Sequence, residues 1–227
     1  AQEIAAAHAV ASAVRHLSER EAAFKVTDLA KAALDFGLPT TMPLIEKRIT
    51  QLADQGALSK GRGTMQGWLT TTDAAALESR MLAEIDKGKG AAVPILPSDI
   101  AGPQLQASAS FNFGMALNAG QEAAGRMILS STNRIVAVQG VAGAGKSSLL
   151  RPAAQILSEN GKRVVGLGVQ NTLVRMLERD TGIPSMTVAR FIKAYGADAK
   201  APIPESLKGS VLIVDEASML ANGDQLK

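Results

Sequence analysis

The chain has 227 residues, 46% of them hydrophobic, a composition that excludes a disordered protein and supports a packed core. It has no cysteine, which excludes disulfides and thiolate metal sites and fits a reducing cytoplasm, and it has no apolar run that would predict membrane insertion. Residues 96–227 carry 13 basic and 10 acidic side chains, against 11 and 11 in residues 1–95, so the net charge of +3 does not by itself indicate DNA binding.

Three short helices are predicted at the start of the chain: one over residues 2–17, one between Thr27 and Gly37, and one between Thr41 and Gly56. Apolar residues recur every three or four positions in each of them. The faces predicted to point inward are Ile4, Ala7, Ala11, Val14 and Leu17, then Leu29, Ala32, Ala33 and Phe36, then Ile45, Ile49 and Leu52. After the first helix, Ser18 and Glu21 have the spacing of a capping box, which predicts a new helical turn.

A hairpin and a fourth helix are predicted next. Residues 57–60 and 67–71 have the composition of two short strands joined by a glycine-rich turn, and residues 72–87 have that of a helix. Three small helices followed by a hairpin form the pattern of a winged helix. Residues 1–90 are therefore predicted to be a small, mainly helical, winged-helix-like accessory domain.

Winged helices often bind DNA through their third helix and their wing. The basic residues at those places are Lys47, Arg48, Lys60 and Arg62. The zero net charge of this module favours a spacer or protein-docking role over direct DNA contact. Trp68 is interpreted as a core anchor, with base stacking as the alternative.

Residues 91–116 are predicted to be a linker and lead-in. Glycines and prolines punctuate residues 87–97, and residues 103–112 show no clear period, so we expect a loop there. Residues 117–227 are predicted to form an α/β, RecA-like P-loop NTPase domain with a parallel sheet and flanking helices, truncated at its C-terminal end. Within it we expect a strand at residues 163–168 and helices at residues 171–179 and 187–192.

Residues 140–147 fit the P-loop pattern G-x-x-x-x-G-K-[ST] at every constrained position. Residues 134–139 are predicted to be the strand before the loop, and residues 146–160 the helix after it. A triphosphate needs closely packed backbone N–H donors, which glycines and a helix N-terminus supply. The predicted ATP-binding residues of this loop are Gly140, Val141, Ala142, Gly143, Ala144, Gly145, Lys146, Ser147 and Ser148.

The chemistry predicted for the loop depends on three side chains besides its backbone. Lys146 would place a positive charge between the β- and γ-phosphates, and Ser147 would ligate Mg²⁺. Residues 211–214 are an apolar strand-like run followed by Asp215 and Glu216, which is a Walker B pattern. Asp215 is predicted to hold Mg²⁺ through its water shell, and Glu216 to polarise the attacking water. A chance glycine turn and an ordinary polar cap are the alternative interpretations of the two motifs.

These motifs together resemble the first RecA-like domain of a RecD-like superfamily 1 DNA helicase, on residues Gln121, 140–147 and 215–219. The short sequence segments at residues 17–21 and 88–90 narrow the resemblance to conjugative relaxase-helicases of the TraI/TrwC type, the MobF family. The resemblance implies a 5′-to-3′ translocase in the bacterial cytoplasm that uses ATP and Mg²⁺ to unwind plasmid DNA. It also implies an upstream relaxase domain and a second RecA-like domain in the parent chain.

The resemblance assigns roles to three further residues. Gln121, 19 positions before Gly140, takes the adenine role, because a side-chain amide can both donate and accept at the Hoogsteen edge of adenine. Thr172 and Thr187 are the candidates for contact with single-stranded DNA. After Gly168 the family usually has a Pro-Thr-x-Arg-Ala-like segment, from which the residues before Thr172 depart.

The chain starts without methionine and ends at Lys227, so we expect it to be part of a longer protein and to lack the arginine fingers of the later helicase motifs. We therefore expect it to bind Mg²⁺-ATP with little turnover. Two alternatives stay open. One is a nucleotide-sensing scaffold or loading module without unwinding activity. The other is a P-loop kinase or partitioning ATPase, which Glu216 and Gln121 disfavour.

Overall fold

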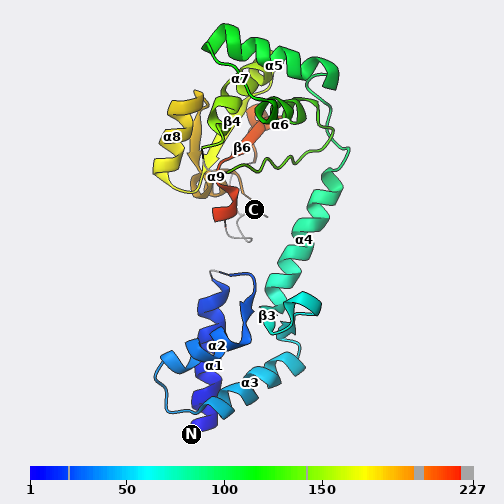
Figure 1. The fold of residues 1–227 in the computed structure, drawn as a ribbon. Helices are drawn as coiled ribbons and strands as arrows, with labels where there is room; N and C mark the ends of the chain where they lie inside the picture. The colour runs from blue at the N-terminus through cyan, green and yellow to red at the C-terminus, as the bar shows by residue number, and fades with distance from the viewer. Residues whose placement is uncertain (20, 142, 197–201, 221–227) are drawn as a thin grey trace. The chain divides into compact units, whose positions relative to one another are not determined.

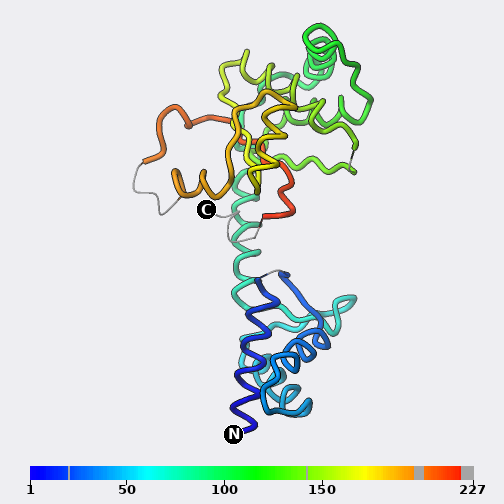
Figure 2. Tube along the Cα trace, turned by 90° about the vertical axis from the view of Figure 1, so that its left-hand side faces the viewer, coloured from blue at the N-terminus to red at the C-terminus, as the bar shows by residue number. Residues whose placement is uncertain are grey.

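The computed structural model describes residues 1–19, 21–141, 143–196 and 202–220. The chain divides into two compact units, Ala1–Leu82 and Ala83–Lys227. Figure 1 labels the elements, and Figure 2 follows the same chain from another side. Each unit has a hydrophobic core of its own.

The first unit combines helices with a small antiparallel sheet, as the sequence predicts. The boundary between the units falls within its last helix. Its elements are α1 (Gln2–Ser18), β1 (Phe24–Lys25), α2 (Val26–Asp35), α3 (Met42–Asp54), β2 (Leu58–Lys60), the 3₁₀ turn η1 (Gly63–Met65), β3 (Trp68–Thr71) and α4 (Thr72–Gly88). Strand β1 was not predicted, because two residues are too few to show a period.

The core of this unit lies between α1, α2 and α3. The predicted inward face of α1 is correct only in part: Val14 and Leu17 pack against the core, but Ile4 is 65% exposed. The fully buried residues of this helix are Ala6, Ala9, Val10 and Ala13. Alanines lie on every side of this helix, so its period does not fix the buried stripe. The predicted inward Phe36 is likewise 48% exposed, because α2 ends one residue before it. The predicted Ile45 and Ile49 are buried.

Two predicted helix starts are also wrong. Ser18 does not open a helical turn but closes α1, where its hydroxyl donates to the carbonyl of Arg15 at 3.2 Å. Thr27 is not an N-cap, because α2 already begins at Val26. A hydroxyl bonded backward to the preceding turn is the local alternative to a forward cap. Thr41 does stand at the N-cap of α3, as predicted.

The sheet order is β1-β3-β2, with antiparallel pairing throughout. Phe24 lies opposite Leu69, and both are buried in the core. Because side chains alternate across a strand, Trp68 belongs to the other face and is only half-buried. Its ring lies 5.6 Å from Lys25 Nζ, in a cation–π contact. The interpretation of Trp68 as a core anchor is therefore wrong.

The second unit begins with a layer of three helices: α5 (Ser98–Phe113), α6 (Ala119–Ser130) and α7 (Lys146–Glu159). Residues 103–112 lie in α5, seen in green at the top of Figures 1 and 2, so the predicted loop is wrong. The inward residues of α5 include Ala101, Leu105 and Ala109. Most of this stripe is made of small residues, and Pro103 lies inside the helix, so the sequence shows little periodicity.

The segment before α5 is bonded to the end of α6. Ala92 N–H donates to the carbonyl of Thr132 at 2.7 Å, and Ile95 N–H donates to that of Leu129 at 2.9 Å. Arg134 N–H in turn donates to the carbonyl of Gly88 at 2.9 Å. Glycines and prolines predict the irregular backbone here, but its partners lie some 40 positions away and are not visible in local sequence.

The sheet of this unit is parallel, in the order β5-β4-β6. One face carries Val164, Val211 and Ile213 against α7, and the other carries Val165 and Leu167 against α9. The strands and the helices around them are β4 (Val164–Gly168), α8 (Asn171–Thr181), β5 (Ser185–Thr187), α9 (Val188–Tyr195), the 3₁₀ turn η2 (Glu205–Leu207), β6 (Val211–Val214) and the 3₁₀ turn η3 (Ala217–Met219). The predicted strands at β4 and β6 and helices at α8 and α9 are confirmed; β5 was not predicted.

The predicted strand at residues 134–139 is the main difference from expectation. No strand is assigned there, and Ile135 and Val138 are 54% and 37% exposed. An apolar, β-branched composition indicates only that a segment can form a β-strand. Whether it pairs depends on a partner strand elsewhere in the chain, and none of the described strands pairs with this segment.

Candidate nucleotide site

The glycine loop at residues 140–145 leads directly into α7. Gly143 and Gly145 have φ of 78° and 74°, left-handed values that favour glycine. Gly145 is the N-cap of α7, so the first free amides of the helix face the loop. Ala142 lies outside the described residues. A curved backbone ending at a helix N-terminus fits an anion such as a phosphate group.

Lys146 folds over this loop. Its Nζ donates to the carbonyl of Gly140 at 3.1 Å and to that of Val141 at 3.4 Å. The ammonium group is thus held by two carbonyls of the loop, and an incoming phosphate oxygen can replace them as its partner. Ser147, the next residue, is exposed and so accessible to a metal ion.

The topology of the sheet determines which edge the loop faces. α7 ends at Glu159 and β4 starts at Val164, so the C-terminal end of α7 adjoins the amino end of β4. Because α7 packs along the sheet, its first residue, Lys146, lies toward the carboxyl edge. Ligands of parallel sheets bind at that edge.

Asp215 and Glu216 follow β6 at the same edge. Asp215 N–H donates to the carbonyl of Leu167 at 2.9 Å, which extends the strand pairing to the carboxylate. Glu216 N–H donates to Asp215 Oδ1 at 3.1 Å. Glu216 has φ of 52°, the only positive value among the described non-glycine residues. Left-handed backbone at a non-glycine residue is strained and is often found at functional sites.

Gln121 connects α6 to the glycine loop. In a capping box with Asn118, its Oε1 accepts from Asn118 N–H and its own N–H donates to Asn118 Oδ1, both at 2.9 Å. Its Nε2 donates to the carbonyls of Ala144 at 3.2 Å and Gly145 at 3.1 Å. The sequence predicted a contact with adenine but gave no sign of this contact with the loop, which joins residues more than 20 positions apart.

The two candidate DNA-contacting threonines lie at the same sheet edge, at helix starts. Thr172 is in the first turn of α8, which follows β4, and Thr187 is the N-cap of α9, which follows β5. Thr187 Oγ1 accepts from Arg190 N–H at 3.2 Å, so this hydroxyl already caps the N-terminus of α9. The carboxyl edge therefore carries the positive dipole ends of α7, α8 and α9.

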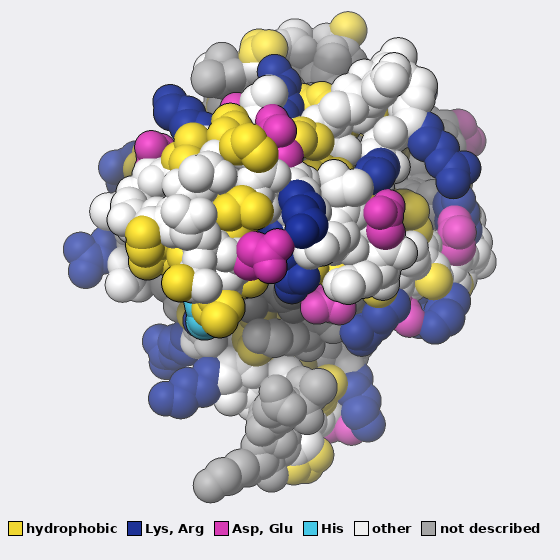
Figure 3. All heavy atoms as spheres, turned by 90° about the horizontal axis from the view of Figure 1, so that it is seen from below, with side chains coloured by type: hydrophobic (Ala, Val, Ile, Leu, Met, Phe, Trp, Pro, Cys, Tyr) yellow, Lys and Arg dark blue, Asp and Glu magenta, His cyan; other side chains and the backbone are white. Residues whose placement is uncertain are grey.

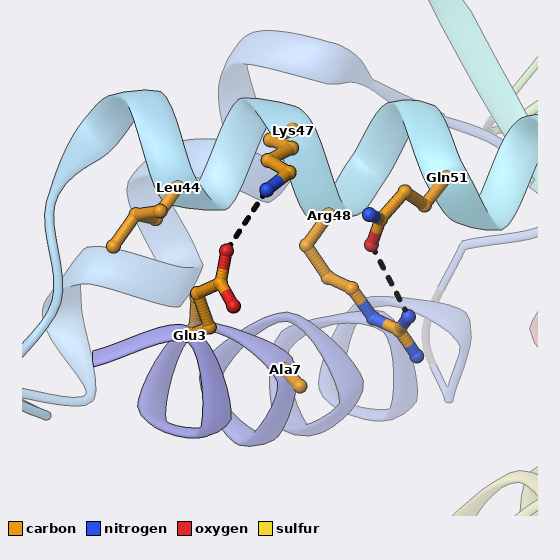
Figure 4. Close-up of a pocket in the computed structure, with 7 residues that line it drawn as sticks. Glu3, Ala7, Leu44, Lys47, Arg48 and Gln51 are labelled. Carbon is orange, nitrogen blue, oxygen red and sulfur yellow. Dashed lines mark hydrogen bonds and ion pairs between the residues drawn. The ribbon is translucent and has the colours of Figure 1, made fainter. Parts of the chain in front are cut away.

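In the first unit, two basic side chains of α3 turn toward α1 and line a pocket (Figure 4). Lys47 Nζ lies 2.8 Å from Glu3 Oε1, and this hydrogen bond, together with the charge of Lys47, lowers the pKa of Glu3 below its ordinary value. Arg48 Nη1 lies 3.5 Å from Gln51 Oε1, and its Nε is buried without a hydrogen-bond partner in the described part of the chain. On the face drawn in Figure 3, the Lys and Arg side chains form several separate groups, and Asp and Glu side chains lie between these groups.

This α/β fold, with a glycine loop at the carboxyl edge of a parallel sheet, is consistent with a P-loop nucleotide hydrolase, and residues 116–227 match a family model described as AAA domain. The chain is 29% identical over 232 residues to the multifunctional conjugation protein TraI of Escherichia coli strain K12, and 28% identical over 232 residues to a TraI of Escherichia coli. Each alignment covers 98% of this chain. The resemblance to RecD-like helicases of the conjugative relaxase-helicase type, predicted from the motifs, is thereby confirmed.

The chain spans 12% of the length of these curated relatives. Among the described residues, no helix combines the length and the apolar character that crossing a membrane requires.

Proposed function

We propose that this chain is the ATP-binding half of an ATP-dependent single-stranded-DNA translocase or helicase that acts in conjugative plasmid transfer. The observation that supports this most is that the start of α7 and the Asp215–Glu216 pair both lie toward the carboxyl edge of the parallel sheet. The matches to an AAA domain and to TraI favour the same conclusion. The bacterial cytoplasm, where plasmid DNA is handled, is the proposed location.

The proposed roles follow from the chemistry of each group. The amides from Gly140 to Ser148 hold the triphosphate, and Lys146 neutralises its outer charge. Ser147 and Asp215 supply oxygen ligands to Mg²⁺, directly or through its waters. Glu216 orients and polarises the attacking water. Gln121 contacts adenine.

The proposal also concerns the rest of the parent protein. The family resemblance implies an upstream relaxase domain and a second RecA-like domain with arginines that stabilise the transferring phosphoryl group. Such arginines contribute roughly three to five powers of ten to the rate of comparable reactions. We therefore propose that this chain alone binds Mg²⁺-ATP with little turnover.

Calorimetric titration of the chain with Mg²⁺-ATP tests nucleotide binding. The wild type is expected to give a saturable heat, and Lys146→Ala is expected to bind at least about tenfold more weakly. Lys162→Ala is the matched control, because it removes the same charge in the connection at the opposite sheet edge, between α7 and β4. Absence of binding by the wild type would refute the proposed function.

Strand unwinding by the parent protein separates the motor from the scaffold or loading module that remains the alternative. Lys146→Ala and Glu216→Gln are both expected to abolish unwinding. Normal unwinding by both variants would support the scaffold and eliminate the motor.

Thr172 and Thr187 are proposed to contact single-stranded DNA at this edge. Thr187→Ala would also remove the cap of α9, at a cost of about 1 kcal/mol in stability. Thr187→Ser is the control for Thr187→Ala, because it keeps the hydroxyl that caps α9 and removes only the methyl group. Weaker single-stranded-DNA binding by Thr172→Ala in the parent protein is the expected result.

The first unit is proposed to be a winged-helix-like accessory domain with a spacer or docking role. Lys47 is paired with Glu3, and Arg48 folds toward α1, so α3 does not present these two charges freely to a phosphate backbone. Removing residues 1–82 from the parent protein is expected to leave single-stranded-DNA affinity within about twofold.

A further inference from the structure

Gln121 holds the glycine loop from its outer side as well as capping α6. Both protons of a side-chain amide nitrogen are available for donation, and here the carbonyls of Ala144 and Gly145 accept from Nε2. Gln121 is half-buried, and a Cβ added at Gly145 would collide with its Nε2. The contact between this side chain and the loop is therefore tight.

The direction of those two carbonyls fixes the direction of two phosphate-binding amides. In a trans peptide unit the C=O and the N–H point in opposite directions. The carbonyl of Ala144 shares its peptide unit with the N–H of Gly145, and the carbonyl of Gly145 shares its unit with the N–H of Lys146. Holding both carbonyls against Gln121 turns these two N–H groups away from its side chain. The carbonyl of Gly145 also accepts from Leu149 N–H at 3.2 Å, so α7 itself helps to orient the second unit.

We propose that Gln121 is a positioning residue for the phosphate-binding amides of Gly145 and Lys146, and that it acts whatever base the nucleotide carries. The inference rests on the proposed nucleotide site, but it differs from adenine recognition. A contact with adenine through Nε2 would have to release one loop carbonyl, because both are already served by the two protons of this nitrogen. Base contact and loop contact therefore compete for one group.

A ligand without a base separates the two roles. Inorganic tripolyphosphate with Mg²⁺ is titrated into the wild-type chain, Gln121→Met and Asn118→Ala, with Mg²⁺-ATP in parallel. Both variants break the capping box, but only Gln121→Met removes the donor to the loop. We expect Gln121→Met to weaken tripolyphosphate binding about tenfold, and Asn118→Ala to leave it within about twofold. Thermal unfolding shows that each variant is folded.

Three results would overturn the inference. One is that Gln121→Met binds tripolyphosphate as tightly as the wild type but binds ATP more weakly. That result would limit the role of Gln121 to contact with the base. Another is an equal loss in Asn118→Ala, which would assign the effect to the helix cap. If neither variant folds, exchange of the Gln121 side-chain amide protons in the wild type decides: slow exchange relative to the exposed Gln170 supports the contact, and equal rates refute it. Failure of the wild type to bind either ligand would instead refute the nucleotide site itself.

Discussion

Substitution of Glu216 separates backbone strain from chemistry. This residue has φ of 52° at the end of β6, and its side chain is exposed. Glu216→Gly and Glu216→Ala both remove the carboxylate that is proposed to polarise water. Only glycine also removes the steric cost of the left-handed conformation.

The expected difference follows from two opposing quantities. A non-glycine residue in the left-handed region costs about 1–2 kcal/mol. Glycine gives back about 0.5–1 kcal/mol, because its unfolded backbone has more freedom to lose. The second unit of Glu216→Gly should therefore be more stable than that of Glu216→Ala by about 0.5–1 kcal/mol. With a urea slope of about 2 kcal/mol per molar, the unfolding midpoints should differ by about 0.3–0.5 M.

Two aromatic residues let the two units be followed separately in one urea titration. The single tyrosine, Tyr195, packs edge-on against Phe191 in the second unit, with ring centroids 5.2 Å apart. The single tryptophan, Trp68, lies in the first unit and should report the same transition in both variants. Equal midpoints from the tyrosine signal, or an alanine variant more stable than the glycine variant, would refute the strain argument. In the parent protein, both variants should lose ATP hydrolysis.

Three further predictions concern binding, charge and packing. Lys146→Ala should weaken Mg²⁺-ATP binding by at least about tenfold in calorimetry, because a charge-assisted contact is lost; unchanged affinity would contradict the role of this lysine. Lys47→Met should raise the pKa of Glu3 toward its ordinary value of 4.5, as NMR titration would show. Because the wild-type pKa is lowered in the folded chain, this pair stabilises the first unit above pH 4.5, and the effect disappears as the pH falls through the folded pKa. Leu105→Ala should destabilise the second unit by about 2–5 kcal/mol in urea unfolding while leaving the Trp68 transition unchanged.

Much of the fold follows from local signals in the sequence. α3 begins after Thr41 with Pro43 in its first turn, and α8 is followed by Gly182, its left-handed C-cap. Both boundaries could be predicted. α5 was missed, since a stripe such as Ala101, Leu105 and Ala109 has little hydrophobic contrast with the alanines and serines around it. Residues 134–139 were overpredicted, since strand composition does not supply a pairing partner.

The candidate site divides in the same way. The glycine-loop pattern and the two carboxylates after β6 predict which residue types form the site. They also predict the sheet edge at which the site lies. They do not give the hydrogen bonds from Gln121 to the loop or the left-handed backbone of Glu216, which depend on where α6 and β6 lie in three dimensions.

The bonds that tie residues 88–96 to the end of α6 bear on how the nucleotide-binding part should be excised for experiments. A gene fragment starting at residue 97 would strip Leu129 and Thr132 of their amide partners and leave their carbonyls to water. A fragment that starts at Ala83 retains all of residues 88–96 and their bonds to the end of α6. The shorter version should then be the easier of the two for proteases to nick near the last turn of α6.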